Sequence, residues 1–227
     1  MTNNNPLTGS SLKGNESEKL RNIVIMLHGY GSNGNDLIQI AYELQKNFPY
    51  IFFSAPNAPF KFDNLPEAFK WFEVYPDGIP IDKASDKQKL KAVNDFNISC
   101  NLIEKHIYEL SKKFQINLNK IFLLGFSQGS MMSIEVGTKL QEKIAGILSL
   151  SGRIYSENFN ETTRNKIPIL IVHGEKDEII EQHRFYETCE ILEKSNYKIE
   201  KHLIQNMGHT INGEVIEISK NFIKSYQ

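Results

Sequence analysis

Short runs of consecutive apolar residues alternate along this chain with longer segments in which apolar residues recur every three or four positions. The short runs predict strands over residues 23–28, 50–54, 121–125, 144–150, 168–173 and 198–204. Runs such as Ile169-Leu-Ile-Val172 leave no polar face, so we expect a sheet that is covered on both sides. Strands that alternate with helices in this way favour a parallel sheet joined by crossover helices.

The longest helical pattern covers residues 86–114. From Leu90 to Phe114 apolar side chains recur at steps of three and four, which predicts one face packed against the core. Ser85 and Gln88 match a capping box, in which each side chain bonds a backbone N–H at the start of the helix. Further helices are predicted over residues 35–47, 128–141, 180–195 and 213–225.

Two segments lack a regular pattern. Residues 1–20 are rich in Asn, Ser, Gly and Lys, and we expect a flexible or loosely docked tail there because few apolar groups offset the entropy of ordering it. Residues 21–227 are then expected to form a single domain, since one core can grow to roughly 250 to 300 residues. Residues 55–84 interleave prolines with aromatic residues, and connections of this length are uncommon unless they serve a function.

Composition places the chain among folded globular proteins. Apolar residues make up 40% of the 227 residues and charged residues 23%. The 26 Lys and Arg residues nearly balance the 27 Asp and Glu residues, which gives a net charge of −1. Because such a chain has no overall field that attracts polyanions, we expect no nucleic-acid partner.

The apolar runs are too short for a membrane segment. The longest extends from Ile23 to Leu27, whereas a spanning helix needs about 20 apolar residues. Residues 1–20 also lack the apolar stretch of a secretory signal, so a cytoplasmic location is expected. Cys100 and Cys189 have neither disulfide-scaffold nor metal-ligand spacing, and both are interpreted as reduced.

The strongest chemical motif is Gly125-Phe-Ser127-Gln-Gly129, a G-x-S-x-G between a predicted strand and a predicted helix. In this context the serine occupies a sharp strand-to-helix turn that holds its hydroxyl above the sheet. Glycine is favoured on both sides because larger side chains would collide with neighbouring backbone. Ser127 is therefore the candidate nucleophile, and it needs a histidine base oriented by a carboxylate.

Loops after two later strands supply candidates for both partners. His173-Gly-Glu-Lys-Asp177 follows the strand at 168–173, where Glu175, Asp177 and Glu178 compete as the acid. The H-G-x-x-D pattern favours Asp177, but the sequence does not measure which carboxylate reaches the base. For the base we favour His209, which lies in a loop after the last predicted strand and before the last helix.

The other five histidines have different positions. His28 and His173 end strands near the expected site, where an orienting or packing role fits them, and the rest lie in helices or a strand: His106, His183 and His202. Acyl transfer also needs two donors for the oxyanion. One is expected from the Gln128 backbone N–H, and the other from the glycine-containing loop Leu27-His-Gly-Tyr-Gly31.

Seven motifs occur in an order that resembles the phospholipase/carboxylesterase family, which includes the acyl-protein thioesterases. They are Leu27-His-Gly-Tyr-Gly31, Ala55-Pro-Asn-Ala-Pro59, Trp71-Phe72, Gly125-Phe-Ser-Gln-Gly-Ser130, Leu150-Ser-Gly152, His173-Gly-Glu-Lys-Asp177 and Gly208-His209. This resemblance implies an α/β-hydrolase fold, with a mostly parallel central sheet and helices on both faces. It also implies a triad of Ser127, Asp177 and His209, and an oxyanion hole made by the backbone N–H groups of Tyr30 and Gln128.

The chain departs from the family pattern at a few positions. The family often has Leu at the position of Tyr30 and usually Gly at that of Ser130, while residues 32–36 look closer to bacterial carboxylesterases. Backbone donors tolerate such changes, so they affect the expected substrate rather than the expected chemistry. Trp71 and Phe72 are candidates for the acyl pocket, although aromatic residues in such a loop equally often fill a core.

Together these features predict a serine hydrolase that cleaves carboxylic esters or thioesters through an acyl-enzyme on Ser127. The mechanism needs no metal and no organic cofactor, and its partner is a small-molecule or acyl-chain substrate. The sequence allows a homodimer without predicting one. The alternatives are a non-catalytic binding protein with the same fold, and a peptidase or dienelactone-type hydrolase. The last would usually have Cys at position 127, and a peptidase of this fold would commonly carry an additional gating domain.

Overall fold

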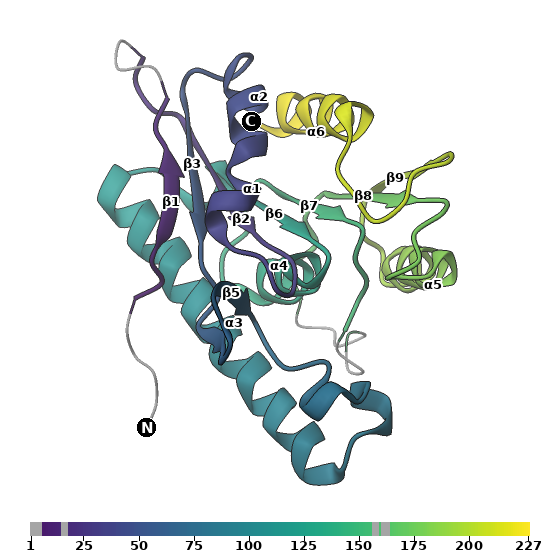
Figure 1. The fold of residues 1–227 in the computed structure, drawn as a ribbon. Helices are drawn as coiled ribbons and strands as arrows, with labels where there is room; N and C mark the ends of the chain where they lie inside the picture. The colour runs from purple at the N-terminus through teal and green to yellow at the C-terminus, as the bar shows by residue number, and fades with distance from the viewer. Residues whose placement is uncertain (1–5, 15–17, 156–158, 160–163) are drawn as a thin grey trace.

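The computed structural model describes residues 6–14, 18–155, 159 and 164–227. Its centre is a seven-stranded sheet in the order β1-β3-β2-β6-β7-β8-β9 (Figure 1). All neighbouring pairs from β3 to β9 are parallel, and β1 pairs antiparallel with β3. The strands are β1 Gly9–Leu12, β2 Asn22–Leu27, β3 Ile51–Pro56, β6 Ile121–Phe126, β7 Gly146–Leu150, β8 Ile169–Gly174 and β9 Ile199–Ile204.

Helices cover both faces of this sheet, as expected for strands that are buried on both sides. The helices are α1 Gly34–Leu37, α2 Gln39–Gln45, α3 Asp86–Phe114, α4 Gln128–Lys139, α5 Gln182–Lys194 and α6 Gly213–Tyr226. Successive side chains along β2 point to opposite faces of the sheet and belong to two separate hydrophobic cores. Ile23 and Ile25 pack in the core with α3, α4 and α5. Val24 and Met26 pack in the core with α2 and α6. The predicted α/β fold is therefore confirmed.

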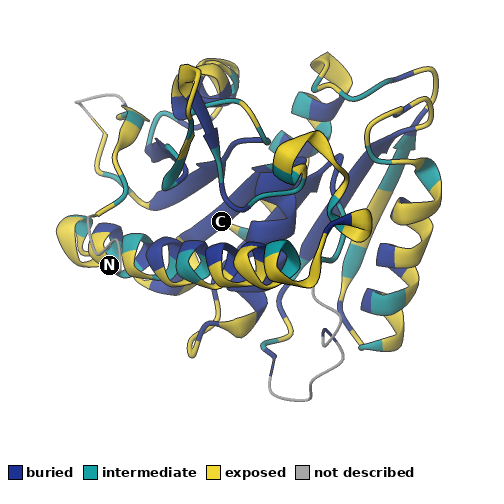
Figure 2. Cartoon of the chain, turned by 60° about the horizontal axis from the view of Figure 1, so that its bottom comes forward, coloured by how far each residue is buried: buried dark blue, intermediate teal, exposed yellow. Residues whose placement is uncertain are grey.

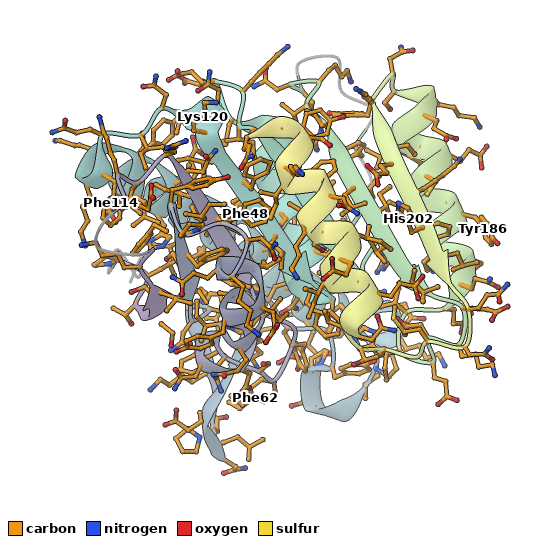
Figure 3. All side chains as sticks on the ribbon, turned by 90° about the horizontal axis from the view of Figure 1, so that it is seen from above. Phe48, Phe62, Phe114, Lys120, Tyr186 and His202 are labelled. Carbon is orange, nitrogen blue, oxygen red and sulfur yellow. The ribbon has the colours of Figure 1, made fainter. Side chains whose placement is uncertain are left out.

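Burial follows this layered arrangement. β2 is buried along its whole length and β6 up to Gly125, and from Ala92 onward α3 alternates buried and exposed positions because one face meets the core (Figure 2). Leu90 and Val93, in the stripe predicted to face the core, are exposed because the first turns of α3 extend beyond it. From above, α6 lies over one face of the sheet, while His202 on β9 and Tyr186 on α5 lie toward its outer edge (Figure 3). The start of α3 agrees with the sequence, because Gln88 Oε1 accepts from the Ser85 N–H at 3.0 Å.

The prediction of a flexible tail over residues 1–20 is wrong for residues 9–12. Gly9 to Leu12 form β1, with Gly9 opposite Pro56 and Leu12 opposite Phe53. A Cβ on Gly9 would lie 2.3 Å from the Ala55 carbonyl oxygen, so glycine permits this close pairing. Backbone hydrogen bonds hold the strand, and an apolar pattern does not report them. Residues 1–5 and 15–17, also in the predicted tail, lie outside the described residues.

The connection over residues 55–84 contains structure that the sequence analysis did not predict. Its first part forms a two-stranded antiparallel sheet, β4 (Phe60–Phe62) with β5 (Leu65–Lys70). A single bridge between Ser32 and Phe69 joins this hairpin to the loop after β2. Two 3₁₀ turns follow, at Pro76–Gly78 and Ile81–Lys83, before α3 begins. The segment therefore lies against the loop where an oxyanion donor was expected.

Candidate active site

Ser127 sits between the end of β6 and the start of α4, in a strained backbone conformation. Its φ of 54° and ψ of −116° lie outside the regions that L-residues usually adopt, and such strain costs on the order of 1 to 3 kcal/mol. Neighbouring backbone leaves no room for other residues at the flanking glycines. A Cβ on Gly125 would lie 2.2 Å from the Gly129 carbonyl oxygen, and one on Gly129 would lie 1.9 Å from the Leu27 carbonyl oxygen.

Neighbouring strands hold this turn in place. The Ser127 N–H donates to the Leu150 carbonyl at 2.9 Å, which ties the turn to the end of β7. Ser130, where the family usually has glycine, shares a 2.6 Å hydrogen bond with Ser149. Its hydroxyl fits because Gly152 leaves space, since a Cβ on Gly152 would lie 2.3 Å from Ser130 Oγ. The departure at Ser130 is thus accommodated by its surroundings.

A buried carboxylate bonds the candidate base. His209 Nδ1 lies 2.7 Å from Asp177 Oδ2, and Asp177 is 5% exposed. The other oxygen, Oδ1, accepts the backbone N–H groups of Ile179 and Ile180 at 2.9 and 2.8 Å. These bonds hold the carboxylate in one orientation, so the His209 proton is placed on Nδ1 and Nε2 is left as the proton acceptor.

The structure distinguishes the three acids that the sequence left open. Asp177 contacts His209, whereas the exposed Glu175 accepts the Asn206 N–H through Oε2 at 3.0 Å. Glu178 is exposed. Asp177 can be buried because the backbone N–H groups of the second and third residues after it bond its carboxylate, and a buried carboxylate requires such partners.

His173 supports the same loop without reaching the cleft. Its Nε2 lies 2.7 Å from the Ile180 carbonyl oxygen and 3.6 Å from Asp177 Oδ2. Its Nδ1 is buried without a hydrogen-bond partner among the described residues. Burial lowers the pKa of His173, although the Ile180 carbonyl and Asp177 oppose that shift. A neutral ring that donates from Nε2 fits these contacts and places His173 as a support of the acid loop.

His28 has an equivalent role beneath the loop after β2. Its Nδ1 lies 2.7 Å from the Gly29 carbonyl oxygen, and its Nε2 accepts the Ala58 N–H at 3.0 Å. Burial lowers the pKa of His28 to about 4, so the ring is neutral near pH 7 and carries its proton on Nδ1. The Trp71 indole donates to the His28 carbonyl at 2.9 Å. These hydrogen bonds of His28 therefore connect the loop after β2 to Ala58 and Trp71 in the segment 55–84.

The structure corrects the expectation that Trp71 and Phe72 line the acyl pocket. Both side chains are 0% exposed and belong to the core beneath the cleft. Their backbone instead holds the Gln128 side chain, whose Oε1 accepts the Trp71 N–H at 2.9 Å and whose Nε2 donates to the Phe72 carbonyl at 2.8 Å. Large aromatic groups gain more from full burial than from a place in the cleft wall, which explains the outcome.

The expected oxyanion donors lie at the same cleft as Ser127. Tyr30 and Gln128 both line it. Within the described part of the chain, neither backbone N–H donates to a protein acceptor. Gln128 is also the first residue of α4, where N–H groups lack helical partners and the helix dipole favours negative charge. This arrangement can stabilise an oxyanion.

A network that the sequence analysis missed holds the Tyr30 side chain. The Tyr30 hydroxyl donates to Glu73 Oε1 at 2.5 Å, and the same oxygen accepts the N–H groups of Val74 and Tyr75 at 2.9 and 2.8 Å. Lys70 pairs with the other carboxylate oxygen. Burial opposes ionisation of Glu73, but these donors together lower its pKa. No motif marks Glu73, because its role depends on the unpredicted β4–β5 hairpin.

Ser127 and His209 line one cleft of about 600 Å³. No hydrogen bond joins Ser127 Oγ to the His209 ring among the described residues, and such contacts often tighten only when substrate binds. Much of the wall is apolar or aromatic: Val74, Tyr75, Pro80, Ile81, Met131, Tyr155, Ile179 and Ile180. A smaller cavity of about 270 Å³ also contains His209, together with His28, Gly29 and Phe126.

Comparison with known proteins agrees with this geometry. Residues 14–227 match the profile of a family described as Phospholipase/Carboxylesterase. The chain belongs to that family. An acyl-protein thioesterase 1 from Candida albicans is 29% identical, and the alignment covers 97% of this chain and 95% of the relative.

Solved structures of two esterases have the same fold. Esterase PE8 superimposes with a TM-score of 0.83 at 27% identity, covering 98% of this chain and all of the other. The carboxylesterase of Bacillus cereus gives a TM-score of 0.75 and covers 99% of this chain and 96% of the other, but at 17% identity it supports the fold alone. Because the thioesterase and the esterase are similarly related, family membership leaves the substrate open.

Proposed function

We propose that this chain is a serine hydrolase that cleaves carboxylic esters or thioesters through an acyl-enzyme on Ser127. The observation that carries the proposal is the 2.7 Å hydrogen bond between His209 and the buried Asp177, at the cleft that Ser127 also lines. Packing alone requires neither this bond nor the strained turn at Ser127. Membership of the phospholipase/carboxylesterase family supports the same activity.

The proposed reaction assigns one task to each side chain. Ser127 Oγ attacks the carbonyl carbon while His209 Nε2 removes its proton, and Asp177 stabilises the imidazolium that forms. The backbone N–H groups of Tyr30 and Gln128 bind the developing oxyanion. His209 then protonates the leaving oxygen or sulfur. Water hydrolyses the acyl-enzyme by the same route, and free acid is released.

The test is hydrolysis of p-nitrophenyl esters and thioesters by the Ser127→Ala variant. We expect kcat to fall by about 10⁶, since the nucleophile acts as a unit with its base. The matched control is Ser225→Ala, which changes an exposed serine on α6 and should leave kcat at the wild-type value. A Ser127→Ala variant that folds and keeps most of its activity would contradict the proposal.

A fluorophosphonate probe distinguishes this function from a binding protein that has lost its chemistry. The probe should label wild-type protein at Ser127 and leave Ser127→Ala unlabelled. Folded wild-type protein without an adduct would favour the binding protein. Competition between ester and peptide substrates tests the peptidase alternative. We expect the ester to be hydrolysed and the peptide to be left intact.

Location and assembly stay predictions. The described helices include none that is long and apolar enough to cross a membrane. We infer a cytoplasmic location from the sequence pattern alone, and fractionation of cells that express the chain would test it. The homodimer that the sequence allows can be tested by light scattering.

A further inference from the structure

The backbone of Arg153 lies next to the turn that carries Ser127. It follows β7 on a loop whose preceding residue, Gly152, packs directly on that turn. A Cβ on Gly152 would lie 2.9 Å from the Ser127 carbonyl oxygen. The half-buried Arg153 side chain lines the same cleft as Ser127 and His209. A cationic group is thus placed within the proposed substrate site.

The other basic groups that line the cleft have acidic partners. Arg184 Nη1 lies 2.8 Å from Glu187 Oε2, and His183 Nδ1 lies 3.0 Å from Glu181 Oε2. Asp82, an exposed carboxylate, also lines the cleft. Neither Asp82 nor any other acidic group of the described chain lies within 4.0 Å of the Arg153 guanidinium.

The contacts of Arg153 leave most of its hydrogen-bonding capacity unused. Its Nη1 donates to the Ile154 carbonyl at 3.3 Å, and its guanidinium carbon lies 5.4 Å from the centre of the Tyr155 ring. Burial lowers its pKa, with a smaller contribution in the same direction from Arg184. A guanidinium carries five donors in a planar fork that suits carboxylate and phosphate groups.

We propose that Arg153 binds an anionic group, a carboxylate or a phosphate, on the ester or thioester substrate. This assignment rests on the proposed hydrolysis at Ser127 and names its substrate class. The apolar wall formed by residues such as Val74 and Ile180 contacts the carbon chain that separates the anion from the reacting carbonyl. Substrates of this class are amphiphilic, with one charged group.

The experiment compares matched thioesters that differ in one charge. In the acyl arm, the glutaryl monothioester of a neutral thiol is compared with its methyl-capped form. In the leaving-group arm, the acyl group is butyryl throughout, and the thiol leaving group ends in a carboxylate, in a phosphate monoester or in a neutral methyl ester. The ratio of kcat/KM for charged and neutral substrates is measured for wild type, Arg153→Gln and Arg153→Lys.

We expect wild type to favour the charged substrate of one arm by about 10- to 100-fold, since hydrogen bonds to charged groups have this strength. Arg153→Gln should abolish the preference through a higher KM, with kcat/KM for neutral substrates within twofold of wild type. Arg153→Lys should restore part of it, because a lysine keeps the charge but not the fork. Arg21→Gln, which removes an exposed arginine that lies over the Tyr50 ring and outside the cleft lining, should keep the wild-type ratio.

The absence of a charge preference in both arms would overturn the assignment, as would an Arg153→Gln variant that retains the preference or loses activity equally on charged and neutral substrates. Failure of the proposed hydrolysis is recognised separately. In that case even neutral thioesters react no faster with wild type than with Ser127→Ala.

Discussion

At the scale of single residues, the site depends on groups whose partners fix their orientation. Asp177 accepts two backbone N–H groups through Oδ1 and bonds His209 through Oδ2. An amide at this position can keep the two backbone bonds. It offers an N–H to the histidine in place of an acceptor, which favours the tautomer with its proton on Nε2.

We therefore expect Asp177→Asn to lower kcat by about 10⁴, the size of effect seen when a triad carboxylate becomes an amide, with little change in folding. Steady-state kinetics on a p-nitrophenyl ester measure this effect. Glu178→Gln changes an exposed neighbouring acid and should leave kcat unaltered. If Glu178→Gln were the damaging variant, the assignment of the acid would be wrong.

The Tyr30 hydroxyl and Glu73 should act as a pair. Their hydrogen bond anchors the residue whose backbone N–H is a proposed oxyanion donor. Loss of alignment at one donor weakens transition-state binding more than substrate binding, so we expect Glu73→Gln to lower kcat by about tenfold with a smaller change in KM.

The Tyr30→Phe variant tests whether the two groups are coupled. It removes the hydroxyl and should lower kcat by a similar factor. The double variant should be no slower than either single variant, because both substitutions break one interaction. Multiplicative effects in the double variant would contradict the coupling.

At the scale of elements, the sequence predicted those that depend on apolar side chains. The six parallel strands and α3 lie within a few residues of their predicted bounds because buried runs and one helical face define them. The predicted helix over residues 35–47 is divided into α1 and α2. Elements held by backbone pairing, β1 and the β4–β5 hairpin, left no comparable pattern.

The same contrast between elements with and without an apolar pattern explains which site residues could be identified from the sequence. Ser127, Asp177 and His209 were identifiable because each follows a predictable strand, at the edge of the sheet where such ends meet. Trp71 and Phe72 were misplaced because the sequence does not show which aromatic groups of a loop become buried. Glu73 and Arg153 were missed because no motif marks them.

The start of α3 allows a test of one element. Gln88 accepts the Ser85 N–H and also donates to Asp77 at 2.9 Å, so it joins the helix to the preceding turn. We expect Gln88→Ala to lower stability by about 1 kcal/mol, or roughly 2 to 4 °C in Tm. Lys87→Ala, at an exposed neighbouring position, should change Tm by less than this. Calorimetry measures both, and equal shifts would contradict the capping role.

At the scale of the whole molecule, buried histidines make stability depend on pH. Burial lowers the pKa of His28 and of His106 to about 4. Between that value and the unfolded pKa of about 6.5, the unfolded chain binds more protons than the folded one. The stabilisation is therefore complete above about pH 6.5 and is lost as the pH falls toward 4, by on the order of 3 kcal/mol at His28.

His106 provides the test, because it lies away from the cleft and bonds Ser54 Oγ at 3.0 Å. In urea unfolding at pH 7, 6 and 5, His106→Gln should lose less free energy of unfolding on acidification than wild type does. Gln39→Ala, at an exposed position on α2 that carries no titratable group, should follow the wild-type dependence. Parallel curves for wild type and His106→Gln would contradict the prediction.

The pairing of β1 with β3 also covers part of a strand that could otherwise pair with another molecule. Without residues 9–12, the segment Phe53-Ser-Ala-Pro56 would lose its partner strand and present unpaired backbone groups to a strand from another molecule. The opposite border, β9, carries Glu200, Lys201 and His202, whose charged and polar groups discourage such addition. Removal of residues 1–12 should therefore produce aggregates visible by light scattering, even though every residue that lines the cleft is retained.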